Sequence, residues 1–300
     1  MNKSAPISKV KSIIRLLRPQ QWVKNLFIFT PLFFNANVTD LHQLILCFYA
    51  FIGFSLVASS IYCLNDVIDV TEDRLHPEKS KRPVASGEIS IHTAVGLALA
   101  LFGGGIAIQI FTGLTPLVVI VTLLYTLLNM AYVFRFKQIA IIDVMCIASG
   151  FVLRVVVGGY AADVVLSHWI VQMTFLLAIF LACAKRRDDV IHYLKEGIIA
   201  RKNIVNYNVD FLNAMMMITA TITILCYIMY TVDKEVIERF HNKDYLYGTA
   251  IFVLTAVFRY LQLAMVREKS GSPTKILLKD RFIQLCILGW IAAFVFIIYF

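Results

Sequence analysis

Acidic side chains recur at regular spacing in residues 65–73, whose sequence is NDVIDVTED. Asp66, Asp69 and Asp73 are three and four residues apart, so at about 100° per residue they share one face of a helix. Three carboxylates on one face repel one another unless a cation lies between them. Hard oxygen ligands of this kind suit Mg²⁺ that holds a diphosphate. A solvated acidic helix end, which needs no ligand, would give the same pattern.

Basic residues follow these aspartates directly. Arg74, Lys79, Lys81 and Arg82 lie in residues 74–88, and such cations can bind the phosphate oxygens that a metal leaves exposed. A basic loop at a membrane is also an ordinary topology signal or a lipid headgroup contact. The neighbouring carboxylates are the feature that topology does not explain.

A second basic cluster begins the segment KRRDD, residues 185–189, which we expect in a loop after an apolar span. Lys185, Arg186 and Arg187 can bind one or more phosphates, Arg through its planar fork and Lys as a point charge. A stop-transfer charge cluster is the alternative explanation.

Two charged residues fall inside a predicted membrane span. Asp143 and Arg154 are eleven residues apart, which is three helical turns, so they share one face. Because an intramembrane charge is costly, each is a candidate functional residue. A structural pair with another helix is the alternative. Arg154 would lie roughly 20 Å from the cytosolic end, which is deep for a cytosolic site.

Composition places all of these residues in a membrane protein. Hydrophobic residues make up 59% of the 300 residues, charged residues 16%, and the mean hydropathy is +0.76. Soluble domains average about 45–50% apolar and about 25% charged residues. The six cysteines fall in apolar segments without metal-ligand spacing, which indicates small core residues rather than disulfides or a zinc site.

The hydropathy pattern predicts an all-α membrane protein with a bundle of nine transmembrane helices. The expected spans are 24–36, 42–63, 89–110, 115–135, 139–161, 166–184, 211–231, 245–264 and 282–300. The short connections leave no room for a separate soluble domain, so we expect a single integral membrane domain over 1–300. Residues 1–21 lack a signal-peptide core and are expected to form a basic cytosolic arm.

The lysines and arginines predict the orientation. Most of the 28 fall in the arm and in the loops on the same side of the membrane, whereas the other side holds Lys234, Arg239 and Lys243. Because cytosolic loops are enriched in Lys and Arg, the N-terminus is expected in the cytosol. The net charge of +9 then reflects topology and anion binding, and nucleic acid is not an expected partner.

These features together resemble the UbiA superfamily of intramembrane prenyltransferases. The chain is most similar to the decaprenyl-phosphate phosphoribosyltransferase branch, also called 5-phosphoribosyl-1-diphosphate synthase. The similar segments are RPQQWVKN (18–25), the aspartate motif (65–73), DRLHP (73–77), RPVASG (82–87), GFVLR (150–154), KRR (185–187) and FRYL (258–261).

One departure separates this chain from ordinary prenyltransferases, which resemble each other in a second Asp-x-x-x-Asp motif after the sixth span. Here that place reads KRRDDVIHY, without two aspartates four residues apart. A second metal site for a prenyl diphosphate is therefore not expected. A cation cluster instead suits a donor and an acceptor that carry additional phosphates.

The resemblance implies transfer of 5-phosphoribose from phosphoribosyl diphosphate to a polyprenyl phosphate of decaprenyl type, for cell-envelope glycolipid precursors. It implies that Asp66, Asp69 and Asp73 hold Mg²⁺ with help from Asn65. Pyrophosphate would leave toward the cytosol from the plasma membrane. The candidate substrate-binding residues are Lys24, Asn65, Arg74, Lys81, Arg82, Lys137, Asp143, Arg154, Lys185, Arg186 and Arg187.

Two other functions stay open at this point. A prenyltransferase would move a polyprenyl group from its diphosphate to an aromatic or other small acceptor. A transporter or lipid channel would also contain intramembrane charges, although no inverted repeat is evident in the spans.

Overall fold

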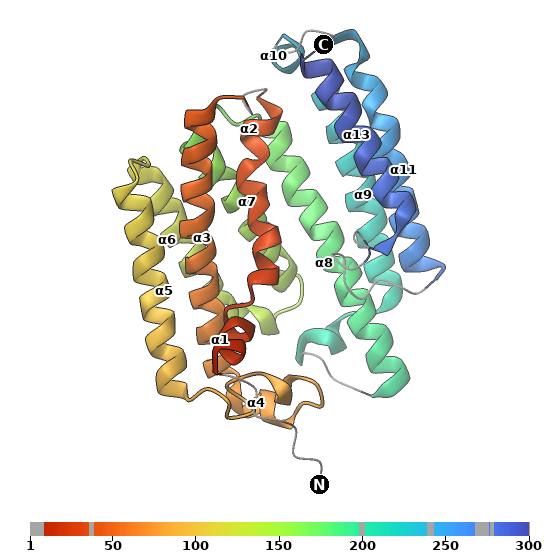
Figure 1. The fold of residues 1–300 in the computed structure, drawn as a ribbon. Coiled ribbons are helices and arrows are strands. Elements are labelled where there is room, and N and C mark those ends of the chain that lie inside the picture. Colours follow the sequence, from red (N-terminus) through yellow and green to blue (C-terminus); the bar gives the residue numbers. More distant parts are fainter. Residues whose placement is uncertain are drawn as a thin grey trace. The chain divides into compact units, whose positions relative to one another are not determined.

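The computed structural model describes residues 9–35, 39–197, 202–238, 243–267, 276 and 279–299. All regular secondary structure in these residues is helical (Figure 1). The chain divides into two compact units, residues 1–134 with 153–164, and residues 135–152 with 165–300. The division falls within one helix, α7, whose first half belongs to the second unit and whose second half belongs to the first.

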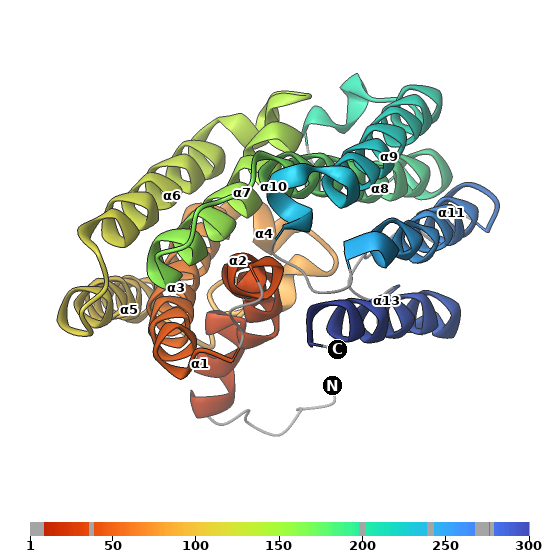
Figure 2. The same cartoon turned by 90° about the horizontal axis from the view of Figure 1, so that it is seen from above.

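The first unit contains most of the N-terminal half of the chain. Its helices are α1 (Lys9–Leu17), η1 (Pro19–Phe29), α2 (Thr30–Phe34), α3 (Leu41–Ile68), α4 (Val70–Leu75), η2 (Lys79–Lys81), α5 (Ile91–Phe111), α6 (Pro116–Phe134) and the end of α7 (Ile142–Ala162). α3 packs beside both α5 and α6 (Figure 2). Asp40 begins α3 by accepting hydrogen bonds from the amides of His42 and Gln43, as an N-cap residue does.

The second unit contains the remaining helices. They are η3 (Phe136–Gln138), the start of α7, α8 (His168–Glu196), η4 (Lys202–Asn206), α9 (Val209–Val232), α10 (Lys234–Ile237), η5 (Lys243–Thr249), α11 (Ala250–Met265) and α13 (Arg281–Tyr299). α8 packs along α9, and α11 packs along α13 (Figure 2). Ser167 caps the start of α8, and Gly197 ends it in the left-handed conformation at φ 69°.

Seven of the described helices are long and apolar enough to cross a membrane, and the chain is an integral membrane protein. They are α3, α5, α6, α7, α8, α9 and the segment Tyr245–Met265. The apolar helix Arg281–Ile297 is shorter. The expected first span is divided between the 3₁₀ helix η1 and the short helix α2, with Pro31 inside α2.

Two predicted helix ends were wrong. α3 continues to Ile68, so Asn65 and Asp66 lie in the helix rather than in the following loop. α8 continues to Glu196, so the KRR cluster is helical and does not begin a loop. Hydropathy shows only where the apolar residues end. A helix can continue beyond that point, because its polar side chains can still bind protein groups or contact solvent.

Most of the described residues of the expected basic arm are helical. Residues 1–8 lie outside the described residues, and residues 9–17 form α1, which packs against α3. Leu16 is fully buried in a cluster with Cys63, Val84 and Ile89. The α1 helix is thereby tied to the polar end of α3, where the aspartates lie (Figure 1).

Candidate active site

The aspartate motif forms an ion-pair cluster with two arginines, all within the first unit. Asp66 Oδ1 accepts hydrogen bonds from Arg18 Nη2 and, at 3.2 Å, from Arg82 Nη1. The same Arg82 Nη1 lies 2.7 Å from Asp73 Oδ2. We call Arg18, Asp66, Asp73 and Arg82 the aspartate–arginine cluster.

Local backbone structure explains why Asp66 and Asp73 meet one cation. Asp69 lies between α3 and α4, and its φ of −87° and ψ of 5° depart from helical values. The hydrogen-bond ladder nevertheless continues, with Asp69 N to Asn65 O at 2.9 Å and Asp73 N to Asp69 O at 2.8 Å. The seven-residue separation of Asp66 and Asp73 is therefore still about two turns, and both carboxylates point to the same side.

Arg18 reaches this cluster from an unusual backbone conformation. It lies between α1 and η1 at φ 53° and ψ 54°, which is uncommon for a non-glycine residue. Pro19 follows it, and a residue before proline is disfavoured in the right-handed helical region. The Arg18 guanidinium also lies 5.2 Å from the centre of the Tyr62 ring. Its ion pair with Asp66 and this ring contact help to hold a conformation that costs about 1–3 kcal/mol.

The donor set of the cluster fits a divalent cation. Asp66 Oδ2 is buried and finds no hydrogen-bond partner in the part of the chain that the structure describes, so one carboxylate oxygen is available as a ligand. An unpartnered buried oxygen is costly, and a hard cation would satisfy it. Among the described residues, no three His, Cys, Asp or Glu side chains are yet arranged around one point. Arg82 instead bridges Asp66 and Asp73.

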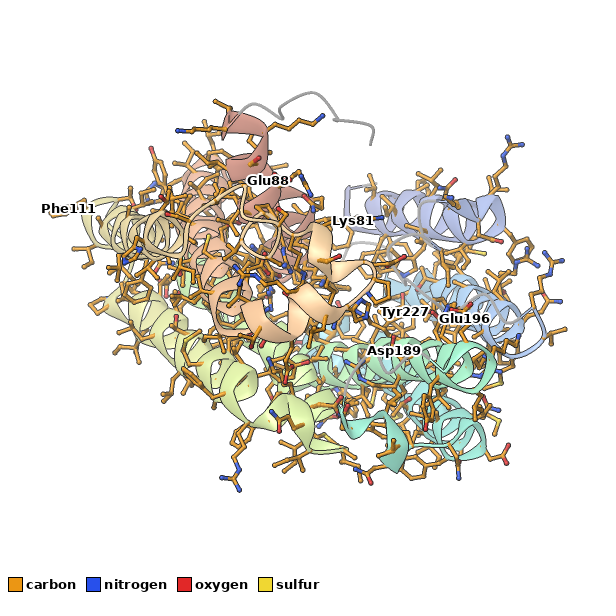
Figure 3. All side chains as sticks on the ribbon, turned by 90° about the horizontal axis from the view of Figure 1, so that it is seen from below. Lys81, Glu88, Phe111, Asp189, Glu196 and Tyr227 are labelled. Atoms are coloured by element: carbon orange, nitrogen blue, oxygen red, sulfur yellow. The ribbon has the colours of Figure 1, made fainter. Side chains whose placement is uncertain are left out.

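Four other predicted residues of the first unit are close to this cluster in the sequence. Asn65 and Asp69 are half-buried, and Arg74 and Lys81 are exposed. Arg74 Nε donates to Ala85 O at 3.3 Å, and the Lys81 carbonyl accepts from Arg15 Nη2 at 2.5 Å. Figure 3 shows Lys81 and Glu88 on the segment that joins α4 to α5.

Lys24 is half-buried on η1. His76 accepts hydrogen bonds at Nδ1 from the amides of Glu78 and Lys79. Partial burial and the nearby Lys79 lower the pKa of His76. This histidine therefore organises the backbone of the loop.

Arg154 has structural partners within the first unit. Its Nε donates to Asn25 Oδ1 at 2.8 Å, and its Nη2 donates to the Tyr125 hydroxyl at 2.9 Å. The guanidinium also lies 4.8 Å from the Tyr125 ring centre and 5.3 Å from that of Phe54. Aromatic faces and neutral acceptors can stabilise a buried cation. These contacts with neighbouring helices explain how the buried position of Arg154 is tolerated.

The two arginines of the KRR cluster are buried in the second unit. Arg186 is fully buried, and its Nε lies 2.8 Å from Asp143 Oδ2. Its Nη1 pairs with Asp189, which Figure 3 shows on α8. The Tyr207 hydroxyl donates to Asp143 Oδ1 at 2.7 Å and accepts from the Ile141 amide at 2.6 Å.

Arg187 is also engaged by protein groups. Its Nε donates to Asn213 Oδ1 and its Nη1 to the Ala264 carbonyl, both at 2.7 Å. Lys185 is exposed on α8, and Lys137 is half-buried on η3. Three adjacent cations in the sequence therefore become one exposed and two buried side chains, because a helix turns successive residues to different sides.

Several residues of these networks were not predicted from the sequence as site residues. They include Arg18, Asn25, Tyr125, Asp189, Tyr207 and Asn213. Arg18 and Asn25 lie in the RPQQWVKN segment, so their motif was noticed but not their roles. Arg18 had one available signal, a cation directly before a proline and shortly before the first apolar segment. No spacing rule links Tyr207 with Asp143, because they are 64 residues apart.

Comparison with known proteins identifies the family. A sequence model of the UbiA prenyltransferase family matches residues 26–283. This chain belongs to the UbiA prenyltransferase family.

Two curated members of the family are similar over nearly their whole lengths. The decaprenyl-phosphate phosphoribosyltransferase of Mycolicibacterium smegmatis is 31% identical, over 98% of this chain and 95% of its own. That of Corynebacterium glutamicum is 29% identical, over 99% of this chain and 90% of its own. The resemblance to this branch of UbiA proteins is thus confirmed.

Solved UbiA structures share the fold. A UbiA homologue from Archaeoglobus fulgidus, bound to GPP and Mg²⁺, matches with a TM-score of 0.69 at 19% identity, over 96% of this chain and 100% of that one. The same homologue bound to Cd²⁺ matches with a TM-score of 0.66 at 18% identity, over 95% of this chain and 99% of that one. These similarities confirm the all-helical UbiA fold.

Proposed function

We propose that this protein transfers 5-phosphoribose from phosphoribosyl diphosphate to a polyprenyl phosphate and releases pyrophosphate. The observation that carries this proposal is the near full-length similarity to proteins named decaprenyl-phosphate phosphoribosyltransferase. The aspartate–arginine cluster supports it, because carboxylates and cations suited to a metal and to phosphates lie side by side. The phosphoribosylated lipid would serve as a precursor of cell-envelope glycolipids.

The chemistry assigned to the first unit is positioning and charge stabilisation. Asp66, Asp69 and Asp73, with Asn65, would hold Mg²⁺, which when bound offsets the charge of the leaving diphosphate. Arg82 and Lys81 would bind phosphate oxygens that the carboxylates cannot contact.

The acceptor phosphate is already anionic when it attacks C1 of the ribose, so the reaction needs no strong general base. Holding the two substrates in the reactive geometry would then supply much of the rate enhancement. We keep Lys24, Lys137 and Lys185 as candidate ligands for the remaining phosphates.

The membrane topology that we propose follows from the distribution of lysines and arginines. We place nine spans in the plasma membrane, with the N-terminus and the aspartate motif on the cytosolic side, where phosphoribosyl diphosphate would be available. Both compact units together would form one transferase domain. The polyprenyl tail would lie between helices that open to the bilayer.

The deciding experiment uses purified full-length protein in detergent with Mg²⁺, phosphoribosyl diphosphate and polyprenyl phosphate. We expect a phosphoribosylated lipid by mass spectrometry, with release of pyrophosphate, and loss of both products when a chelator is added. Substrate-dependent pyrophosphate release also separates an enzyme from a transporter. Absence of product with active, folded protein would contradict the proposal.

A second candidate is a prenyltransferase that uses a prenyl diphosphate and a small acceptor. It is favoured by the shared fold with the Archaeoglobus fulgidus homologue, which was solved with GPP bound. The lack of a second Asp-x-x-x-Asp motif in residues 185–193 argues against it. Prenylated product from a prenyl diphosphate and an aromatic acid, without phosphoribosylated lipid, would establish this alternative.

A further inference from the structure

The two arginines of the aspartate–arginine cluster occupy the carboxylate oxygens that a metal would need. Arg82 Nη1 contacts both Asp66 Oδ1, at 3.2 Å, and Asp73 Oδ2, at 2.7 Å. Arg18 Nη2 contacts the same Asp66 Oδ1. One oxygen of Asp66 thus accepts from two arginines, whereas its other oxygen is buried and has no hydrogen-bond partner among the described residues.

We propose that Arg18 and Arg82 are exchangeable cations that neutralise Asp66 and Asp73 until a metal ion binds, and then turn to the diphosphate that the metal holds. This inference deepens the proposed function, since it rests on the metal–diphosphate site assigned there. In this proposal Arg18 becomes part of the site, and Arg82 pairs first with the aspartates and then with the diphosphate.

Charge balance is the first argument. Asp66 and Asp73 carry two negative charges on side chains that are 1% and 3% exposed, and Arg18 and Arg82 carry two positive charges. Buried carboxylates without a partner are strongly disfavoured, so a cation must be present even before the substrate arrives. The arginines meet this need, and the cluster is neutral as a whole.

The same balance predicts cooperative binding of metal and diphosphate. A divalent cation alone must displace the arginines and remain beside them, which adds two positive charges to a neutral cluster. A diphosphate supplies the missing negative charge. Its oxygens can bind the metal and also pair with the released guanidinium groups. Each ligand therefore raises the affinity for the other by the same factor.

The distribution of exposure is the second argument. The carboxylates are fixed in the interior, whereas the Arg18 and Arg82 side chains are 21% and 26% exposed. A long, partly exposed arginine can change partners by rotating its side chain, without movement of α3 or α4. Arginine also forms bidentate pairs with phosphate as well as with carboxylate, so both states are chemically favourable.

The test is to measure metal alone and metal with pyrophosphate in separate titrations. Purified full-length protein in detergent is titrated with Mn²⁺ by electron paramagnetic resonance, and with preformed Mg²⁺–pyrophosphate by calorimetry. For Arg82→Gln we expect Mn²⁺ alone to bind about tenfold more tightly than in the wild type, a difference of about 1.4 kcal/mol. For the same variant we expect Mg²⁺–pyrophosphate to bind about tenfold more weakly.

Opposite changes for the two ligands distinguish exchange from a structural role, which would weaken both together. Arg18→Gln removes one of the two arginine contacts to Asp66 and leaves the Arg82 contacts in place. We expect the same pair of signs for this variant, so it tests the proposal if Arg82→Gln does not fold. The matched control is Arg15→Gln, which removes an equal charge from the neighbouring α1, where Arg15 pairs with Glu88. Both affinities should stay within about twofold of the wild type in that control.

Unchanged or weaker Mn²⁺ binding in both cluster variants would overturn the exchange. Neither titration measures transfer, and pyrophosphate is the leaving group of phosphoribosyl and prenyl donors alike. Failure of the exchange is thus distinct from failure of the proposed phosphoribosyl transfer, which the mass-spectrometric assay tests.

Discussion

Arg186 and Asp143 form an ion pair in the interior of the second unit. Their closest atoms, Nε and Oδ2, are 2.8 Å apart, and the side chains are 1% and 0% exposed. Tyr207 joins the pair by donating to Asp143 while accepting from the Ile141 amide next to the start of α7. Asp143 thus connects α7 to both α8 and the segment before α9. An arginine that the sequence suggested for phosphate binding is thus ion-paired inside the protein.

Arg186→Ala should therefore destabilise the fold before it alters donor binding. Removing one partner of a buried pair leaves an uncompensated charge, which typically costs about 3–5 kcal/mol. The measurement is the free energy of unfolding in detergent, with the exposed Lys185→Ala as the control on the same helix turn. A stable Arg186→Ala variant with a raised donor requirement would instead place α8 in the donor site.

Asp69→Asn should abolish transfer without preventing membrane insertion. It removes one carboxylate from the proposed metal site, and loss of several kcal/mol of charge stabilisation corresponds to at least about a hundredfold in rate. The readouts are product formation by mass spectrometry and resistance of the protein to extraction from membranes. Glu72→Gln, an exposed acidic residue of α4, is the control and should retain activity. Full activity of Asp69→Asn would refute the metal assignment.

Short-range sequence patterns predicted much of the fold. The apolar segments expected at 89–110 and 115–135 are α5 (Ile91–Phe111) and α6 (Pro116–Phe134), within two residues at each end. Apolar composition specifies such helices locally, whatever they pack against. The spacing of Asp66 and Asp73 likewise brought both carboxylates to one cation, because helical geometry depends only on neighbours in the chain.

Partners distant in the sequence could not be predicted in this way. Asp143 and Arg154 share a predicted helix face, yet Asp143 pairs with Arg186 and Tyr207 whereas Arg154 contacts Asn25 and Tyr125. Each choice depends on which helices pack together, and the local spacing of residues in the sequence does not show that. The ion pairs of Arg18 and Arg82 with the aspartates could not be predicted for the same reason.

Gly158→Ala should disrupt the packing of η1 on α7 in the first unit. A Cβ atom at Gly158 would lie 1.9 Å from the carbonyl oxygen of the buried residue Ile28. Backbone atoms cannot move aside as a flexible side chain can, so we expect a loss of at least about 1–3 kcal/mol, the usual cost of overpacking.

The control for this change is Gly96→Ala on α5, because a Cβ there meets nothing within 4 Å. Since alanine is favoured over glycine inside a helix, this variant should be neutral or slightly stabilising. Thermal unfolding in detergent compares the two. Equal midpoints for both variants would contradict the close approach of η1 and α7.

Glu88 should make stability depend on pH in the acidic range. Its carboxylate accepts a hydrogen bond from Ser12 at 2.5 Å and pairs with Arg15 at 3.1 Å, and these contacts lower its pKa from the usual value of 4.5. A carboxyl group whose pKa is lower in the folded state stabilises the fold above its unfolded pKa. That contribution is lost as the pH falls from about 4.5 through the folded pKa.

Glu88→Gln should remove this dependence, because the amide does not titrate. The wild type should exceed the variant in stability by roughly 0.2–1 kcal/mol near pH 7, given that Arg15 is partly exposed, and the difference should shrink toward zero below pH 4.5. Unfolding midpoints between pH 7 and pH 4 provide the measurement, with Glu78→Gln as a control for an exposed carboxylate in the same loop. A difference that stays constant across this range would show that the Ser12–Glu88 contact stabilises α1 independently of the charge on Glu88.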